Sequence, residues 1–310
     1  MLAQNISKRN NQKKDKPFKV KWIYKCFGIS KQAYYKRLKS YNKEEIQYDK
    51  LLKLVKEQRD KSGHRTGGRK LYKALKTDME ALNIHMGRNK FFDFLRSYNL
   101  LVPKLRNFHI TTNSRHHFHK YKNLVKDKVP TRPEQLWVSD ITYIKTQHGH
   151  TYLALVTDAY SKQIMGFKIA NHMKASLCVE ALSMAIKNRK YPNMKLIHHS
   201  DRGFQYCSSE YVNFAEKHNI QMSMTEEYDP YENAVAERIN HTLKYEYGLK
   251  NTLKDLDLAR KIVKDSVFRY NVFRLHDSLQ LRTPVDVHKN PDIPYKSYKR
   301  DKSKLEKLKI

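Results

Sequence analysis

The order of hydrophobic patterns between residues 134 and 250 restricts the possible folds more than any other feature. Three runs have the alternation or the apolar centre of β-strands and are separated by short turns: 136–146, 150–161 and 163–170. Helix-like and strand-like spacing then alternate, in the order helix 176–188, strand 195–201, helix 209–219, strand 220–225 and helix 234–248. This β-β-β-α-β-α-β-α order predicts an α/β domain whose sheet begins as a three-stranded antiparallel meander.

The charge balance changes near the start of that domain. Residues 1–133 contain 34 Lys and Arg against 10 Asp and Glu, residues 134–250 contain 13 against 13, and residues 251–310 contain 15 against 8. The regional charges of +24, 0 and +7 add up to the formal net charge of +31. Such an excess in a chain with 21 tyrosines is typical of proteins that bind nucleic acid. Charge alone also allows a ribosome-associated or generally adhesive basic protein.

The sequence does not favour a membrane span or a disulfide framework. No window holds about 18 consecutive apolar residues, and the amino terminus lacks the apolar segment of a signal peptide. Cys26, Cys178 and Cys207 are far apart and form no C-x-x-C pair, which disfavours both disulfides and cysteine-rich zinc sites. We therefore expect a soluble cytoplasmic protein.

The basic segment 1–43 predicts a first helix-turn-helix. Residues 20–40 indicate two short helices around Gly28, with Ser30 as the N-cap of the second. A helix in this position suits contact with DNA. The residues expected to make that contact are Lys31, Tyr34, Tyr35 and Arg37.

Residues 44–102 predict a second helix-turn-helix domain, built from three helical patterns. Their spacing and the turn at Gly87 place Arg88 and Lys90 in the third helix, where we expect them to contact DNA. The apolar positions that define the three helices are Leu51, Leu52, Val55, Leu71, Leu75, Met79, Phe91, Phe94 and Leu95.

Three further segments connect or extend these domains. Residues 103–133 are basic, contain three prolines and have little periodicity, which predicts a linker that follows the phosphate backbone. Residues 251–288 are expected to be a helical extension, and the Lys-rich residues 289–310 a flexible tail. Clustered histidines in the linker are interpreted as solvated residues rather than metal ligands: His116, His117 and His119.

Three acidic residues have distinctive positions in the domain 134–250. Asp140 lies within the first predicted strand, and Asp201 follows the fourth. At about 100 degrees per residue, Glu237 falls on the polar side of the last helix with His241 and Lys244. The opposite side of that helix carries Val235, Ile239 and Leu243. Because open α/β sheets bind ligands at strand ends, we expect Glu237 to reach toward the two aspartates there.

Three clustered carboxylates have a chemical use. Like charges repel unless they hold a hard divalent cation, and Mg²⁺ favours carboxylate and phosphate oxygens. Two such ions about 3.5 to 4 Å apart would activate the attacking oxygen and stabilise the leaving oxygen of a phosphodiester displacement. Taken singly, an Asp at a strand end is usually a turn residue, and a Glu on a polar helix face is usually solvated. Asp158, at the end of the second strand, is interpreted as such a turn former.

The spacing of the acids favours the catalytic interpretation. Sixty residues separate Asp140 from Asp201, and 35 separate Asp201 from Glu237. The three surrounding blocks, LWVSDITYI, HHSDRGFQY and YENAVAERINHTLKYE, closely resemble the catalytic blocks of DDE transposases of the IS-three family, the OrfB type with an integrase core. The later RYNVFRLHDSLQLRTPVDV looks like the closing motif of that family, and the resemblance covers about residues 18–288.

This resemblance implies a fold and a metal site. The fold is α/β, with an RNase H-like catalytic core of the retroviral integrase type at 134–250 and amino-terminal all-α helix-turn-helix regions. Asp140, Asp201 and Glu237 are implied to be catalytic and to bind two Mg²⁺ or Mn²⁺ ions. Positions that match the family around these acids are His199, Ser200, Gly203, Gln205, Asn233 and Ala234.

The second block departs from the family at three positions. Arg202 and Phe204 stand where Gln and Ser are commoner, and Cys207 stands where Thr or Ala is usual. None of the three would be a metal ligand, so the departures concern contacts with DNA. Arg202 is expected to add a phosphate contact. Gly203 is expected to permit the turn that lets DNA approach Asp201.

The resemblance implies a DNA transposase that binds the terminal inverted repeats of its insertion sequence, cleaves a strand with water and joins the 3′ hydroxyl to target DNA. No covalent protein intermediate is expected. A homo-oligomer on DNA in the bacterial cytoplasm, at the nucleoid, is implied, with an upstream OrfA product or OrfAB fusion as partner, because this chain lacks a heptad run long enough for a zipper. Two alternatives stay open: a metal nuclease of the same fold without strand transfer, and a non-catalytic DNA-binding protein from a decayed element.

Overall fold

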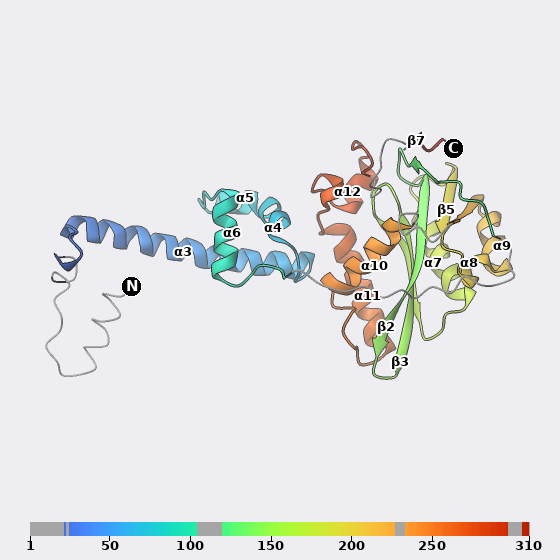
Figure 1. The fold of residues 1–310 in the computed structure, drawn as a ribbon, viewed down its shortest axis with the longest axis horizontal. Coiled ribbons are helices and arrows are strands. Elements are labelled where there is room, and N and C mark those ends of the chain that lie inside the picture. Colours follow the sequence, from blue (N-terminus) through green and yellow to red (C-terminus); the bar gives the residue numbers. More distant parts are fainter. Residues whose placement is uncertain (1–21, 23–24, 104–119, 227–232, 297–305, 310) are drawn as a thin grey trace. The chain divides into compact units, whose positions relative to one another are not determined.

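The computed structural model describes residues 22, 25–103, 120–226, 233–296 and 306–309 (Figure 1). These residues fall into two compact units, one within Met1–Lys56 and Lys76–Met86 and the other within Glu57–Leu75 and Gly87–Ile310. None of the helices in these described stretches is long and apolar enough to cross a membrane.

The helix α3 (Lys31–Ser62) is continuous. It runs through two helices that the sequence predicts as separate: the second helix of segment 1–43 and the first helix of domain 44–102. Its start agrees with the prediction: the Ser30 hydroxyl accepts a hydrogen bond from the amide three residues later at 3.1 Å, and Gly28 has the left-handed φ of +64°. No Gly or Pro interrupts the helix before Gly63, whose φ is +109°. The break predicted near residue 43 is therefore absent.

Three shorter helices follow, where the sequence predicts two: α4 (Gly68–Ala74), α5 (Lys76–Ala81) and α6 (Arg88–Ser97). The pattern predicted as one helix over 67–82 is divided into α4 and α5. Gly67 and Gly87 occupy the extended N-cap positions before α4 and α6. Eight of the nine predicted apolar positions are buried, and Leu52 is half-buried. The buried eight are Leu51, Val55, Leu71, Leu75, Met79, Phe91, Phe94 and Leu95.

A five-stranded sheet forms the centre of the second unit (Figure 1). The predicted meander is confirmed, with β2 (Leu136–Thr146), β3 (Gly149–Asp158) and β4 (Ile164–Ala170) pairing antiparallel. The strands β5 (Leu196–Ser200) and β6 (Ile220–Met224) then add in parallel on the other side of β2. The resulting strand order is β4-β3-β2-β5-β6, which places β2 in the middle of the sheet.

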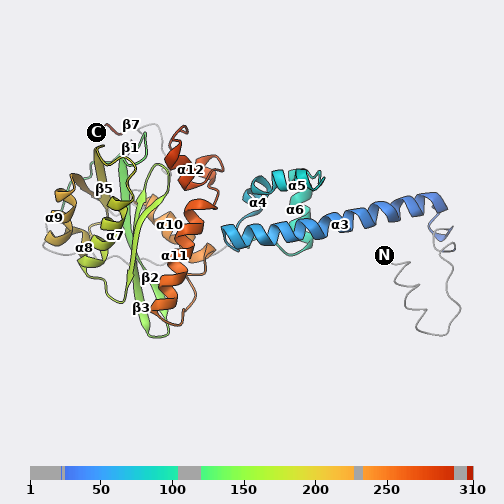
Figure 2. The same ribbon diagram turned by 180° about the vertical axis from the view of Figure 1, so that it is seen from behind.

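Helices cover both faces of this sheet (Figures 1 and 2). On one face lie α7 (Ala175–Lys187), the short α8 (Phe204–Cys207) and α9 (Ser209–Lys217), and on the other lie α10 (Ala234–Glu246) and α11 (Leu256–Val272). Side chains alternate along β2 and so contribute to two apolar cores. Trp137 packs in the cluster with α7 and α9, whereas Leu136 and Val138 pack in the cluster with α10 and α11. The predicted order of strands and helices is thus confirmed, with α8 in addition.

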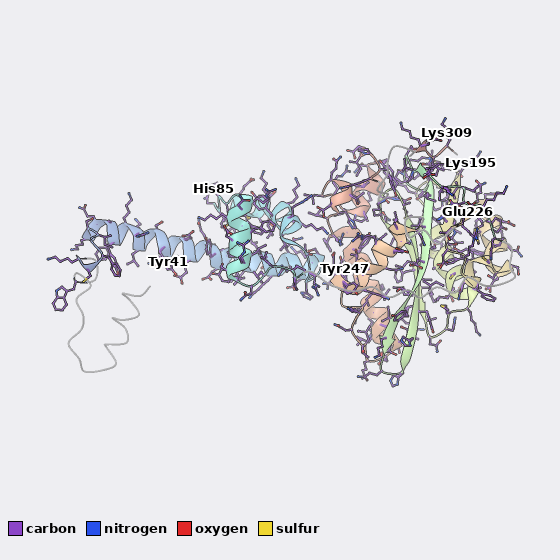
Figure 3. The ribbon with its side chains drawn as sticks, viewed as in Figure 1. Tyr41, His85, Lys195, Glu226, Tyr247 and Lys309 are labelled. Carbon is purple, nitrogen blue, oxygen red and sulfur yellow. The ribbon has the colours of Figure 1, made fainter. Side chains whose placement is uncertain are left out.

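Parts of the linker and tail pack on the domain. The pair β1 (Lys128–Val129) and β7 (Glu306–Lys307) is parallel, and Leu308 is buried. The Asn123 amide donates to the carboxylate of Glu226, labelled in Figure 3, at 3.0 Å. The described part of the tail is therefore held by the core, in contrast to the flexible tail that we expect from its composition. His116, His117 and His119 lie outside the described residues.

The closing motif begins in the last turn of α11 and packs against the sheet. Asn271 acts like a strand partner: its side chain accepts from the Ile164 amide and donates to the Ile164 carbonyl, both at 2.9 Å. A 3-10 turn, η1 (Asp277–Leu279), leads to α12 (Pro284–Lys289), where Thr283 caps the helix and Pro284 occupies its first turn. The Thr-Pro pair of the motif is thus a helix start.

The close packing of α7 on β4 generates a stability prediction. A Cβ on Gly166 would lie 2.1 Å from the Ala181 carbonyl oxygen and 2.6 Å from the Ala185 amide nitrogen, both backbone atoms. Gly166→Ala is expected to lower the free energy of unfolding by about 3 kcal/mol or more, because backbone must move. Gly67→Ala, with nothing within 4 Å, is the control and should cost less than about 1 kcal/mol. Denaturant unfolding measures both, and equal stability of the two variants would contradict the packing argument.

Candidate active site

The strands β2 and β5 separate at the point where the first two acids lie. Their parallel register ends with Val138 opposite His199. Asp140 and Asp201 each lie two residues further along their own strand direction. Beyond the last pair, β2 stays bonded to β3, whereas β5 ends one residue before Asp201. Both carboxylates therefore lie at the same opening edge of the sheet, where α/β folds bind ligands.

The turn after β5 is shaped around the Asp201 carboxylate. Its Oδ1 accepts a hydrogen bond from the Gly203 amide at 3.0 Å. Gly203 has φ of −64° and ψ of 142°, which any residue adopts, so the turn does not need a glycine for its backbone angles. A Cβ there would lie 3.0 Å from Asp201 Oδ1 and 3.3 Å from Gln205 Oε1. The glycine thus provides room beside the carboxylate, which corrects the expectation that it provides the turn.

The helix α10 brings Glu237 to this edge. Glu237 is exposed in the first turn, and the helix buries its predicted apolar side. That side consists of Val235, Ile239 and Leu243. The α10 helix packs against β2, which carries Asp140. The helical spacing therefore predicts the orientation of Glu237 correctly.

Two asparagines join α10 to β2. Asn240 donates from Nδ2 to Asp140 Oδ2 at 2.8 Å, and Asn233 donates from Nδ2 to the Ser139 carbonyl oxygen at 3.0 Å. The sequence identifies Asn233 only as a motif match and does not identify Asn240. The available signal is position, since Asn240 follows Glu237 by three residues and so lies one turn away on an adjoining face.

The three acids influence one another electrostatically. Burial raises the pKa of Asp140, and the neighbouring charges of Asp201 and Glu237 add to this against the lowering effect of the Asn240 hydrogen bond. Together these effects bring the pKa to about 7. Partial burial also raises the pKa of Glu237. Without a cation, Asp140 is thus partly protonated near neutral pH.

The donors suit a hard divalent cation but do not form a closed ligand group. All three side chains offer carboxylate oxygens, which Mg²⁺ prefers. The repulsion acting on Asp140 is of the kind that a shared cation relieves. Within the described part of the chain, no three His, Cys, Asp or Glu side chains converge into a ready-made metal site. The acids interact electrostatically, but their side chains do not converge, so a bound cation would have to draw them together.

A cationic and aromatic surface adjoins the acids on α10 and β2. The Lys244 ammonium lies 4.2 Å from the ring centre of Tyr143, which is 41% exposed. Burial lowers the pKa of Lys244, and the charge of Asp140 opposes that effect. One turn earlier, the ring of His241 stacks on that of Tyr245 at 4.3 Å. Positive charge and ring faces are thus available beside the carboxylates.

Buried polar contacts lie behind the aspartates. His198 Nε2 lies 2.7 Å from the Ser139 hydroxyl and 2.8 Å from the Tyr211 hydroxyl. Burial lowers the pKa of His198 to about 3, so its ring is neutral. His199 Nδ1 lies 2.9 Å from the Ser223 hydroxyl, across to β6. The paired histidines of the second block therefore link β2, β5, β6 and α9 rather than facing the acids.

The residues expected to contact DNA lie in three places. Arg202, half-buried, directly follows Asp201, and His241 and Lys244 are half-buried on α10. Arg88 and Lys90 are exposed in the first turn of α6. The remaining four are on α3 in the other compact unit, exposed except for the half-buried Tyr34: Lys31, Tyr34, Tyr35 and Arg37. Arg88 and Lys90 belong to the same compact unit as the acids, but among the predicted contacts only the residues at 202, 241 and 244 lie within 134–250.

Comparison with known proteins identifies the family. Residues 130–230 match the family model "Integrase core domain", and residues 218–284 match a second model of that description. The "Insertion element IS600 uncharacterized 31 kDa protein" of Shigella sonnei is 32% identical over 262 residues, 84% of this chain and 94% of that protein. The chain belongs to the IS-three family of insertion-sequence transposases. Its fold is the expected RNase H-like α/β core with an amino-terminal helical region.

Other relatives cover less of the IS-three family chain. "Transposase InsF for insertion sequence IS3A" of Escherichia coli (strain K12) is 35% identical over 179 residues, 57% of this chain, and the match spans 60% of the length of InsF. Among solved structures, the simian T-cell lymphotropic virus intasome aligns with a TM-score of 0.45 at 19% identity, covering 76% of this chain and 79% of that one. The HTLV-2 integrase catalytic core in complex with magnesium aligns with a TM-score of 0.42 at 18% identity, covering 52% and 99%.

The raised pKa of Asp140 predicts a cost to stability. Because the folded-state pKa lies above the unfolded value, ionised Asp140 destabilises the fold; this cost is absent below about pH 4, grows up to about pH 7 and is complete above. In EDTA, Asp140→Asn should therefore raise the free energy of unfolding by about 2 to 4 kcal/mol at pH 8 and by almost nothing at pH 4. Denaturant unfolding at both pH values measures the difference.

The exposed Asp257, which pairs with Arg260 on α11, supplies the control. Asp257→Asn should change stability by less than about 1 kcal/mol at either pH. An equal gain for Asp140→Asn at pH 4 and pH 8 would show that its ionisation is not the cause.

Proposed function

We propose that this chain is the transposase of an insertion sequence, which binds the terminal inverted repeats and catalyses Mg²⁺-dependent cleavage and transfer of DNA strands. The observation that carries the proposal is the placement of Asp140 and Asp201 at the diverging ends of β2 and β5, with Glu237 presented by α10. Membership of a transposase family supports DNA transposition by an integrase-like protein.

In this proposal Asp140, Asp201 and Glu237 hold two Mg²⁺ or Mn²⁺ ions. When bound, the ions would supply charge for the attacking and leaving oxygens of a phosphodiester displacement. Water and then a DNA 3′ hydroxyl would be the nucleophiles. The chain prepares this by holding Asp140 Oδ2 through Asn240, which leaves the other oxygen unshared by that amide. Gly203 keeps the space beside Asp201 open.

The DNA contacts form a second part of the proposal. Near the acids, Arg202, His241 and Lys244 would contact phosphates, and Tyr143 would offer a ring beside Lys244. The helices α3 and α6 would recognise the inverted repeats through the residues at 31, 34, 35, 37, 88 and 90. Homo-oligomers on DNA, an OrfA partner or OrfAB fusion, and a place at the bacterial nucleoid complete the proposal.

Strand-transfer assays test the proposed reaction. With labelled DNA copied from the ends of the element and Mg²⁺, wild type should give cleaved and joined products. Asp201→Asn and Glu237→Gln should bind the DNA but lose at least about 100-fold in product, because each removes a carboxylate that would hold the cations acting on the reacting phosphate. Cleavage without joining would favour a nuclease instead. If wild type and variants alike only bind, also when fused to an upstream OrfA, the proposal fails.

The contribution of Lys244 is tested by binding without catalysis. Lys244→Gln should weaken binding of an end-bearing duplex about 3- to 10-fold at low salt and reduce the salt slope by about 1, because one phosphate contact is lost. Lys264→Gln, at an exposed lysine on α11, is the matched control and should change affinity less than twofold. Fluorescence anisotropy in EDTA over a range of salt concentrations gives both quantities. Equal effects of the two variants would rule out a specific contact at Lys244.

A further inference from the structure

The two asparagines on α10 contact consecutive residues of β2. Asn233 is 7% exposed and bonds the backbone of Ser139, while Asn240 is 6% exposed and bonds the side chain of Asp140. They are seven positions apart, which corresponds to about two helical turns, so they lie on nearly the same side of α10. Glu237 lies between them, and its amide donates to the Asn233 carbonyl oxygen at 3.2 Å.

The orientation of both amides is fixed by their partners. The Ser139 carbonyl and the ionised Asp140 carboxylate are acceptors, so the NH₂ end of each amide faces β2. The Oδ1 atoms of Asn233 and Asn240 are buried and have no hydrogen-bond partner among the described residues. A buried acceptor without a partner destabilises a fold, and an apolar side chain would avoid that cost. The directional bonds to β2 are therefore what these side chains contribute.

Apolar packing alone does not fix the register of α10. Val235, Ile239 and Leu243 hold the helix against the sheet, but burial of apolar surface is non-directional. It tolerates small shifts of a helix along or around its axis. Hydrogen bonds at two points, one at the N-cap and one two turns later, exclude such shifts for the segment that carries Glu237.

We propose that Asn233 and Asn240 are positioning residues that tie α10 to β2 and so set Glu237 relative to Asp140. The proposal rests on the proposed function, in which these two acids share a divalent cation. Asn233 acts at a distance, since its own partner is backbone and it contacts neither acid through its side-chain bond. It therefore separates the effect of position from the effect of removing a group that touches Asp140.

The experiment compares Asn233→Ala and Asn240→Ala with a control on the same helix. Thr242→Val removes a buried hydroxyl that donates to the Arg238 carbonyl oxygen at 2.9 Å, a bond within α10 that does not reach β2. The full chain is used, first without metal and then with Mn²⁺ alone as the probe. The rate of backbone amide hydrogen exchange in the first turn of α10 shows whether the helix is still tied to β2. The Mn²⁺ dissociation constant, from electron paramagnetic resonance, depends on the position of Glu237. Thermal unfolding measures stability.

Both asparagine variants are expected to bind Mn²⁺ at least fivefold more weakly than wild type. Asn233→Ala should also speed exchange in the first turn at least tenfold, and Thr242→Val should change neither quantity at a similar loss of stability. Where alanine unfolds the chain, Asn233→Ser introduces an N-cap hydroxyl that is too short to reach Ser139, and the same weakening of Mn²⁺ binding is expected.

Two results would overturn the proposal. One is an unchanged rate of amide hydrogen exchange in Asn233→Ala. The other is faster amide hydrogen exchange with an unchanged Mn²⁺ dissociation constant, a result that would make Asn233 purely structural. A wild-type chain that binds no Mn²⁺ is a different result. It contradicts the proposed function, while faster exchange in Asn233→Ala would still uphold the tether between α10 and β2.

Discussion

The divergence of two parallel strands controls the whole candidate site. Pairing between β2 and β5 ends at Val138 and His199, and Asp140 and Asp201 lie two residues further along their respective strands. Had the ladder continued, the two carboxylates would stand directly side by side, at a strand spacing of about 4.8 Å, between bonded strands. Because β5 ends at Ser200, the two carboxylates lie where the strands separate. The helix α10 lies beside this opening and presents Glu237 to it.

The negative charges at this edge lower the stability of the chain when no cation is bound. The half-buried Asp140, beside Asp201 and Glu237, costs folding free energy whenever it is ionised. The chain offsets little of that cost locally. Asn240 is a neutral donor, and Lys244 lies over Tyr143 and forms no ion pair with Asp140 in the described part of the chain. The neutral charge of residues 134–250 within a chain of +31 fits this division: the surrounding arms attract a polyanion, and the edge of the sheet stays ready for a cation.

Periodicity in the sequence predicts the parts of the structure that depend on burial. It identifies the meander, the alternation of helices and strands, and the side of α10 that carries Glu237, because one face of each element must be apolar. It fails where the outcome depends on continuity or on a distant partner. The polar stretch near residue 43 resembles a boundary, yet it contains no Gly or Pro, and α3 runs through it. The role of Asn240 depends on the Asp140 carboxylate 100 residues earlier, which no local pattern reveals. The role of Gly203 depends on the room beside Asp201 and not on its backbone angles.

Residues beyond 250 belong to the same folding core, which explains why a closing motif accompanies the acids. Val263, Val267 and Tyr270 of α11 are buried in one apolar cluster with β2, β3 and α10. The ion pair between Arg274 and Glu246, with N–O distances of 2.7 and 2.6 Å, then joins the segment after α11 to the last turn of the helix that carries Glu237. Removing one partner of such a buried pair leaves an uncompensated charge, so α10 depends on residues that follow it by some thirty positions. The edge that carries the acids is therefore held along α10 by side-chain hydrogen bonds to β2 from its N-cap and its middle, and by the closing motif at its end.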